Sequence, residues 1–201
     1  MTMLSISEVN KDWGICGFAS TLGALYKQGI FKDTIKRAVS RHEFDTRLLA
    51  EIKTYLVILQ SEDKNILLNE IQKFTRTFGG IYSGFTIQGY INKVNTIAVS
   101  PPLRTDKGFS IAMPPNAVVD YLKRICDVKN PTLVQCNSTT NNNVILGIGD
   151  KRKVNEWKGL GHWVYKKSNL EIYNWGQKET LTELLAHNPN WQIIYEIRNL
   201  R

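Results

Sequence analysis

The chain has few of the residues that build metal sites and disulfide frameworks. Its 201 residues include three cysteines and three histidines. The cysteines, Cys16, Cys126 and Cys136, are odd in number, unrelated in spacing and form no Cys-x-x-Cys pair. This pattern predicts neither a set of structural disulfides nor a zinc site. We therefore expect no metal ion and no cofactor.

Long apolar runs are also lacking. None approaches the roughly 20 residues that a transmembrane helix needs. The first residues do not have the basic-then-apolar pattern of a cleaved secretory signal. We therefore expect synthesis in the cytoplasm without a signal peptide and no insertion into a membrane. Export through a specialised system that needs no such peptide stays open.

The composition is that of a folded domain. Hydrophobic residues make up 42% and charged residues 22% of the chain, close to the averages for soluble proteins. The length suits a single domain over residues 1–201. Basic residues outnumber acidic ones by 26 to 18, a net charge of +8, which suits an anionic partner. The densest basic run, residues 150–158, mixes both signs, so we interpret it as a solvated loop and expect no nucleic acid partner.

Apolar spacing divides the chain into a helical half and a β half. Helical spacing predicts helices over residues 14–27, 31–39, 44–59, 64–78 and 116–126. Glycine, aromatic and β-branched residues predict an irregular insertion of loop and strand over residues 80–113. Strand-like runs follow over residues 133–136, 144–148, 162–165, 170–174 and 191–197. A short helix over residues 180–186 begins with a capping box of Thr180 and Glu183. The predicted fold class is α+β.

Cys16 stands between Gly14 and Gly17 at the start of the first predicted helix. A thiol at a helix N-terminus lies in the positive end of the helix dipole and near unpaired N–H groups, which favours the nucleophilic thiolate. The alternative is a buried, inert cysteine that happens to open a helix, since free cysteine is among the most buried residue types.

A cysteine nucleophile needs a base and a group that orients the base. His42 lies in a charged stretch that predicts a surface position, and His187 follows a helix end, where histidine caps carbonyls. His162, in Gly159-Leu-Gly-His-Trp-Val-Tyr165, opens a strand behind glycines that permit close approach of another segment. A strand histidine also fits a purely structural role, so His162 is a candidate base rather than an assigned one.

Asn174, twelve residues after His162, supplies the third group. If the two strand-like runs pair as an antiparallel hairpin across residues 166–169, both side chains lie at the same end of neighbouring strands. The amide oxygen can then accept a hydrogen bond from the imidazole. Asn10, six residues before Cys16, is a candidate partner of the Cys16 backbone N–H in an oxyanion hole.

The order of cysteine, histidine and asparagine, with a helical half before a sheet half, resembles the papain-like cysteine hydrolases. Cys16-Gly-Phe-Ala-Ser20 is similar to the start of their central helix. Asn174-Trp-Gly176 is similar to the Asn-Ser-Trp-Gly segment of papain, one residue shorter. The C-terminal pattern from Gly161-His-Trp-Val164 to the last strand is closer still to the bacteriocin-processing peptidases and related bacterial effector proteases.

The resemblance implies a papain-like fold and a Cys-His-Asn triad. Cys16 is then the nucleophile, His162 the base and Asn174 the orienting residue, while Asn10 takes the place of the family's oxyanion glutamine. Many bacterial members carry aspartate where this chain has Asn174. Because asparagine has no charge with which to stabilise an imidazolium, we expect a thiolate–imidazolium pair held by the helix dipole and geometry.

The function that the resemblance implies is a cysteine peptidase acting on a protein or peptide through an acyl-enzyme. A Lys-, Asn- and Ile-rich composition is compatible with a secreted bacterial effector or toxin, and residues 80–113 are the candidate for setting specificity. Two alternatives stay open. One is a glutamine deamidase or transglutaminase that uses the same chemistry. The other is a binding module that has lost activity, with the five tryptophans as core or contact residues.

Overall fold

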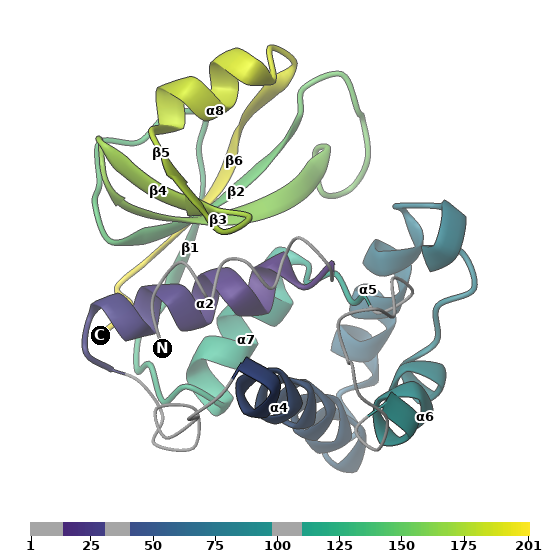
Figure 1. Ribbon diagram of the computed structural model, residues 1–201. Coiled ribbons are helices and arrows are strands. Elements are labelled where there is room, and N and C mark those ends of the chain that lie inside the picture. Colours follow the sequence, from purple (N-terminus) through teal and green to yellow (C-terminus); the bar gives the residue numbers. More distant parts are fainter. Residues whose placement is uncertain (1–13, 31–40, 98–109) are drawn as a thin grey trace.

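The structure is a computed structural model that describes residues 14–30, 41–97 and 110–201 (Figure 1). Its α-helices are α2 (Cys16–Lys27), α4 (Arg41–Ser61), α5 (Asn65–Arg76), α6 (Ile87–Ile97), α7 (Pro115–Arg124) and α8 (Leu181–His187). Its strands are β1 (Thr132–Gln135), β2 (Val144–Asp150), β3 (Leu160–Ser168), β4 (Glu171–Asn174), β5 (Gln177–Glu179) and β6 (Trp191–Arg198). The predicted helix over residues 31–39 lies outside the described residues.

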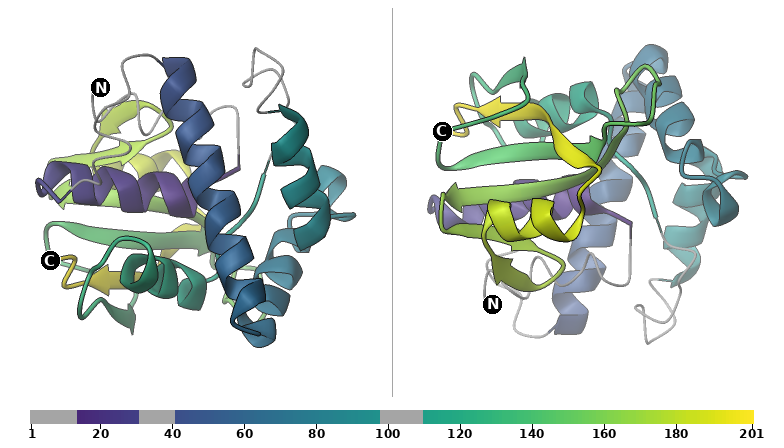
Figure 2. Two further views of the ribbon diagram at one scale, coloured as in Figure 1. Left: turned by 90° about the horizontal axis from the view of Figure 1, so that it is seen from below. Right: turned by 90° about the horizontal axis from the view of Figure 1, so that it is seen from above.

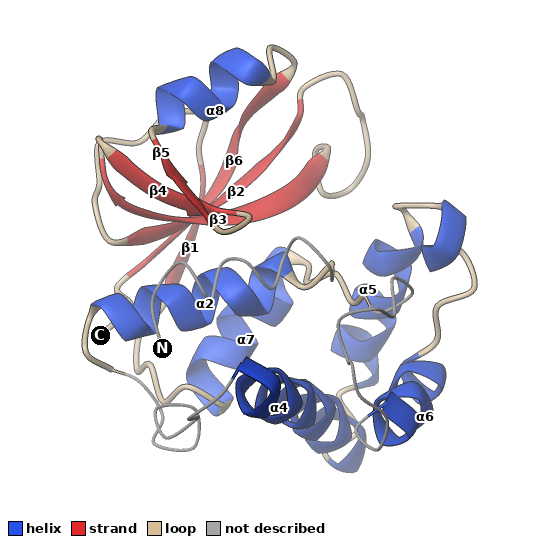
Figure 3. Cartoon of the chain, viewed as in Figure 1, coloured by secondary structure: helices blue, strands red, loops and turns tan. Residues whose placement is uncertain are grey.

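The strands form one antiparallel sheet in the order β1-β6-β2-β3-β4-β5. Helix α2 crosses one face of this sheet, and α8 covers the other (Figures 1 and 2). The remaining helices gather on the α2 side, so helices and strands are segregated (Figure 3). The α+β class is therefore confirmed for the part of the chain that the structure describes.

Apolar side chains fill the space on each face of the sheet. On the α2 side, Phe18 and Leu22 pack in the same cluster as Trp163 of β3. On the α8 side, Leu184 packs in a smaller cluster with Val164 of β3. Successive residues of a strand point to opposite faces, so β3 contributes to both clusters and is held from both sides.

The prediction of an irregular segment over residues 80–113 is wrong for residues 87–97, which form α6. Ile87, Tyr90, Ile91 and Val94 are buried at helical spacing, and α6 lies beside α4. The β-branched and aromatic residues favour strands locally, but burial of this one stripe favours a helix. Before α6 lies a short 3₁₀ turn, η1 (Gly80–Tyr82).

The β half differs from prediction at its turns. Strand β3 continues to Ser168, so the turn before β4 is shorter than residues 166–169. Strand β5 was not predicted, and Trp175 and Gly176 form a two-residue turn that joins it to β4. The capping box of α8 is confirmed, because Glu183 N–H donates to Thr180 Oγ1 at 3.1 Å and Thr180 N–H donates to Glu183 Oε2 at 2.7 Å.

Of the two glycines before His162, Gly159 permits the predicted close approach of another segment, which contains Gly149, and Gly161 does not. A Cβ at Gly149 would lie 2.0 Å from the Gly159 carbonyl oxygen, and Gly159 has a φ of +80°. We predict that Gly149→Ala lowers the free energy of unfolding by about 3 kcal/mol or more, because backbone atoms cannot move aside as a side chain can. Denaturant unfolding followed by circular dichroism measures this loss.

Gly161→Ala is the matched control, because a Cβ there meets no atom closer than 3.9 Å. Its free energy of unfolding should change by less than about 1 kcal/mol. Equal losses in the two variants would contradict the close approach.

Candidate active site

Cys16 is the first residue of α2, which begins two residues after the predicted start at Gly14. The residues before it are fixed by the segment that follows residue 109. Ile111 N–H donates to the Gly14 carbonyl at 3.2 Å, and Gly14 N–H donates to Ser110 Oγ at 3.3 Å. A Cβ at Gly17 would lie 2.8 Å from Met113 Cβ. The helix N-terminus that carries the thiol is therefore held against residues 110–113.

The thiol lies at an unpaired edge of β3. Pairing between β3 and β4 begins at Tyr165↔Tyr173, so Trp163 has no β4 partner. Helix α2 takes that place, because Ser20 Oγ donates to the Trp163 carbonyl at 2.8 Å and the Trp163 N–H lies against the Cys16 thiol. Cys16 and Ser20 are one helical turn apart and share a face of α2. The thiol is thus held beside the residue that directly follows His162.

His162 and Asn174 are joined by a short hydrogen bond. His162 Nε2 lies 2.6 Å from Asn174 Oδ1, and the two residues are only 5% and 3% exposed. This confirms the predicted placement of both side chains across an antiparallel hairpin. Asn174 Nδ2 donates to Glu179 Oε1 at 2.9 Å, so Oδ1 is the amide atom that faces the ring. In the neutral imidazole Nε2 then carries the proton, and Nδ1 is left to accept one.

Two tryptophans enclose the imidazole. The Trp175 ring stacks on it with centroids 4.6 Å apart, and the Trp191 ring lies 6.2 Å away. Trp175 and Gly176 both have positive φ, 43° and 77°, as the two central residues of a type I′ hairpin turn must. A tryptophan in this conformation is strained, yet its side chain is 39% exposed. Trp175 is therefore a contact residue that covers His162 and does not belong to the core.

Burial controls the ionisation of both groups. It raises the pKa of the Cys16 thiol to about 11, although the N–H groups of Trp163, Gly17 and Cys16 itself lower it. It lowers the pKa of His162 to about 4, against the hydrogen bond to Asn174, which raises it. Within the described residues, no hydrogen bond joins Cys16 Sγ to the imidazole. Because burial raises the pKa of the thiol and lowers that of the imidazole, it disfavours the expected thiolate–imidazolium pair.

The other predicted residues are separate from this cluster. Asn10 lies outside the described residues, so of the predicted oxyanion-hole groups only the Cys16 N–H is described, one of the N–H groups that a helix N-terminus leaves unpaired. His42 falls in the first turn of α4. His187 is exposed and is the last residue of α8, which agrees with its predicted position at a helix end.

Three contributors to the site were missed by sequence reasoning. They are Ser20, which binds the β3 edge, Trp175, which covers the ring, and Glu179, which holds the amide. Helical spacing from Cys16 could have indicated Ser20. Glu179 could not be found, because strand β5 was not predicted.

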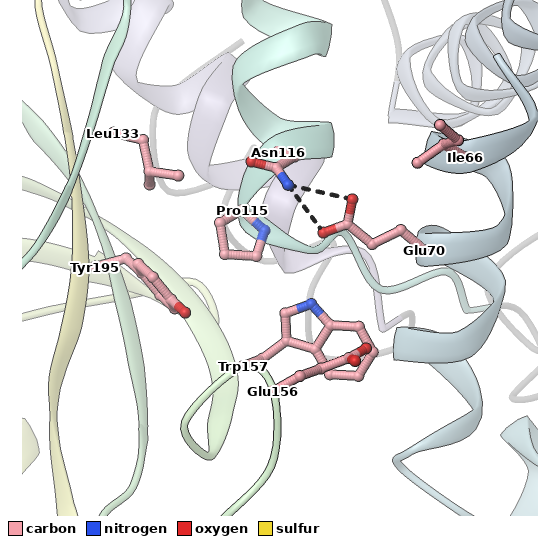
Figure 4. Close-up of a pocket in the computed structure, with 8 residues that line it drawn as sticks. All are labelled: Ile66, Glu70, Pro115, Asn116, Leu133, Glu156, Trp157 and Tyr195. Atoms are coloured by element: carbon pink, nitrogen blue, oxygen red, sulfur yellow. Dashed lines mark hydrogen bonds between the residues drawn. The ribbon is translucent and has the colours of Figure 1, made fainter.

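A pocket of about 380 Å³ lies elsewhere, between α5, α7 and the sheet (Figure 4). Its carboxylates already have partners. Asn116 Nδ2 donates to both oxygens of Glu70 at 3.2 and 3.3 Å, and Lys73 Nζ lies 2.7 Å from Glu156. Since no cysteine or histidine lines this pocket, the nucleophile and base candidates lie outside it.

Over residues 14–30, 41–97 and 110–201, no three His, Cys, Asp or Glu side chains are grouped so that they could hold a metal ion. None of the helices in these ranges combines the length and apolarity that crossing a bilayer requires.

Comparison with known proteins returned no family model, no curated protein and no solved structure that matches this chain.

The buried, neutral His162 predicts how stability depends on pH. The unfolded chain protonates this histidine below about pH 6.5, and the folded chain only below about pH 4. Between these values the unfolded state binds more protons, so stability falls as the pH falls. We predict that His162→Gln abolishes about 3 kcal/mol of the loss in unfolding free energy between pH 7 and pH 4.

Urea unfolding at several pH values measures this dependence. His187→Gln is the control and should keep the native dependence, because His187 is exposed at a helix end. If the unfolding free energies of the native chain and of His162→Gln changed equally with pH, the pKa of His162 would not be lowered by folding.

Proposed function

We propose that the protein is a cysteine hydrolase that uses Cys16, His162 and Asn174, and that it is a peptidase acting on a protein or peptide. The observation that carries the proposal is one arrangement of backbone and side chains. The Cys16 thiol lies against the Trp163 N–H. His162, which directly precedes Trp163, contacts Asn174 through Nε2, so that Nδ1 stays available to accept a proton.

The reaction has two stages. His162 Nδ1 takes the proton of Cys16 as Sγ attacks the carbonyl carbon, and the Cys16 N–H at the start of α2 stabilises the oxyanion. The imidazolium then donates this proton to the leaving nitrogen as the C–N bond breaks, which leaves a thioester and an amine. Water releases the acyl group in the second stage, with His162 as its base.

Burial determines when the proton moves. Because it raises the pKa of the thiol and lowers that of the imidazole, a resting ion pair is unfavourable. In the proposed mechanism His162 therefore acts as a general base during the attack. Asn174 suits this role, since an amide orients the ring without the negative charge that would keep it protonated.

The same two pKa shifts favour a second candidate function, a binding module without activity. A thiol whose pKa is about 11 is almost entirely protonated at neutral pH. If His162 does not take its proton, Cys16 reacts no faster than a thiol with no base beside it.

Alkylation of the three thiols separates these candidates. With iodoacetamide, we predict that Cys16 is labelled at least about tenfold faster than Cys136 at pH 7, because it has a base beside it. The rate for Cys16 should stay nearly constant from pH 5 to pH 8, since neutral His162 is the base throughout. In His162→Gln the rate should fall and then rise about tenfold per pH unit with the thiolate fraction.

Peptide mass mapping assigns each label, and His187→Gln should behave as the native chain does. Cys136 is the internal reference, because it is partly exposed and burial raises its pKa too. Labelling of Cys16 at the rate of Cys136, unaffected by His162→Gln, would support the binding module and reject the hydrolase.

The reaction type is tested with unfolded proteins and glutamine-containing peptides as probes. We expect new N-termini and paired fragments in mass spectra, absent with Cys16→Ala, because the proposed leaving group is a backbone amine. Conversion of glutamine to glutamate without cleavage would instead assign a deamidase, and glutamine joined to an added amine would assign a transglutaminase.

A further inference from the structure

Glu179 extends the contact between His162 and Asn174 into a chain of three side chains. It lies on β5, partly exposed, and its Oε1 accepts a hydrogen bond from Asn174 Nδ2 at 2.9 Å. In the described ranges Glu179 forms no ion pair. The nearby Glu171 differs in this respect, because Lys167 and Lys178 lie 2.8 and 3.6 Å from it.

The β4–β5 hairpin brings Glu179 to this position. The register pairs Ile172 with Glu179 and Asn174 with Gln177. Residues two apart on a strand share a face, so Glu179 lies on the face that carries Asn174. The same hairpin places Trp175 over His162. The β4–β5 hairpin thus supplies the described side chains that orient the imidazole, with the exception of Trp191 on β6.

An amide has two different ends, and Glu179 distinguishes them. Oδ1 only accepts hydrogen bonds and Nδ2 only donates them, while a carboxylate only accepts. With Nδ2 directed at Glu179, Oδ1 must face His162, and the ring must donate to it from Nε2. If the amide turned over, Nδ2 would face the ring, which would then need its proton on Nδ1 and could not accept one from Cys16.

We propose that Glu179 is a positioning residue, whose carboxylate fixes the orientation of the Asn174 amide and thereby keeps the His162 proton on Nε2. This inference rests on the proposed function for its importance to catalysis. The hydrogen-bond polarity that it assigns can be measured without any reaction.

The proposal also explains why asparagine stands at position 174. An aspartate there would set two carboxylates within hydrogen-bond distance of each other, and like charges so close destabilise one another. Asn174 and Glu179 therefore depend on each other's chemistry. Exchanging which of them is the carboxylate should preserve the chain of contacts, since an amide at 179 can donate to a carboxylate at 174.

The test uses four variants of the full chain: Glu179→Gln, Glu179→Ala, Asn174→Asp and the double variant Asn174→Asp with Glu179→Gln. ¹⁵N NMR of the imidazole nitrogens at pH 7 gives the tautomer of His162, assigned by its loss in His162→Gln. Alkylation of Cys16 gives the rate. Gln177→Ala, an exposed site on the same strand, is the matched control and should change neither measurement.

We expect Glu179→Gln to keep the Nε2–H tautomer and a labelling rate within about threefold of native, because its amide oxygen still accepts from Asn174. Glu179→Ala should populate the Nδ1–H tautomer and slow labelling about tenfold. Asn174→Asp should disturb the contact with His162, because two carboxylates then face each other, and adding Glu179→Gln should restore the Nε2–H tautomer of the neutral ring.

The two proposals fail in different ways. An unchanged tautomer in Glu179→Ala, or an Asn174→Asp defect that Glu179→Gln does not relieve, would overturn the positioning role whatever the rates are. Slow, His162-independent labelling of native Cys16 would overturn the hydrolase while the tautomer measurement stands. If Glu179→Ala does not fold, the Asn174→Asp pair of variants decides.

Discussion

The hydrogen bond from Ser20 Oγ to the Trp163 carbonyl joins the two halves of the molecule at the place where chemistry is proposed. Strand β4 ends before it reaches Trp163, which leaves a stretch of β3 with free backbone groups. An unpaired backbone group away from water is costly, so α2 stabilises the fold by covering this edge. The same contact holds the Cys16 thiol beside Trp163, the residue that follows His162. Any change that displaced α2 from β3 would therefore disturb both stability and the site.

Enclosure of His162 has two opposite effects. Trp175 and Trp191 exclude water from the bond between His162 and Asn174, which strengthens that bond and fixes the ring. Burial also removes the solvation that a charged imidazole or thiolate needs. The strained backbone of Trp175 shows that the fold maintains this enclosure against a local preference. The result is an ordered imidazole whose charged form is disfavoured by burial.

Sequence patterns predicted those features that depend on a period or on one local motif. Helix α2 with Cys16 at its start, the capping box of α8 and the pairing of His162 with Asn174 are examples. Helix α6 was missed because strand-favouring residues outweighed the spacing of its buried stripe. Strand β5 is only three residues long, too short to show alternation, and Glu179 was missed with it. The effect of burial on the two pKa values was also missed, because the helix dipole can be inferred from sequence and the depth of burial cannot.

Asn174 and Glu179 together solve a problem that burial creates. A carboxylate directly against His162 would orient the ring but would also raise its pKa, and a protonated ring cannot accept a proton from Cys16. The amide of Asn174 transmits the hydrogen-bond polarity of a carboxylate while keeping the charge one residue further away, where Glu179 is partly exposed to water. In the proposed arrangement the ring keeps one tautomer, and burial lowers its pKa. Where burial disfavours charge on both thiol and imidazole, a correctly placed acceptor nitrogen is what would distinguish a nucleophile from an inert core cysteine.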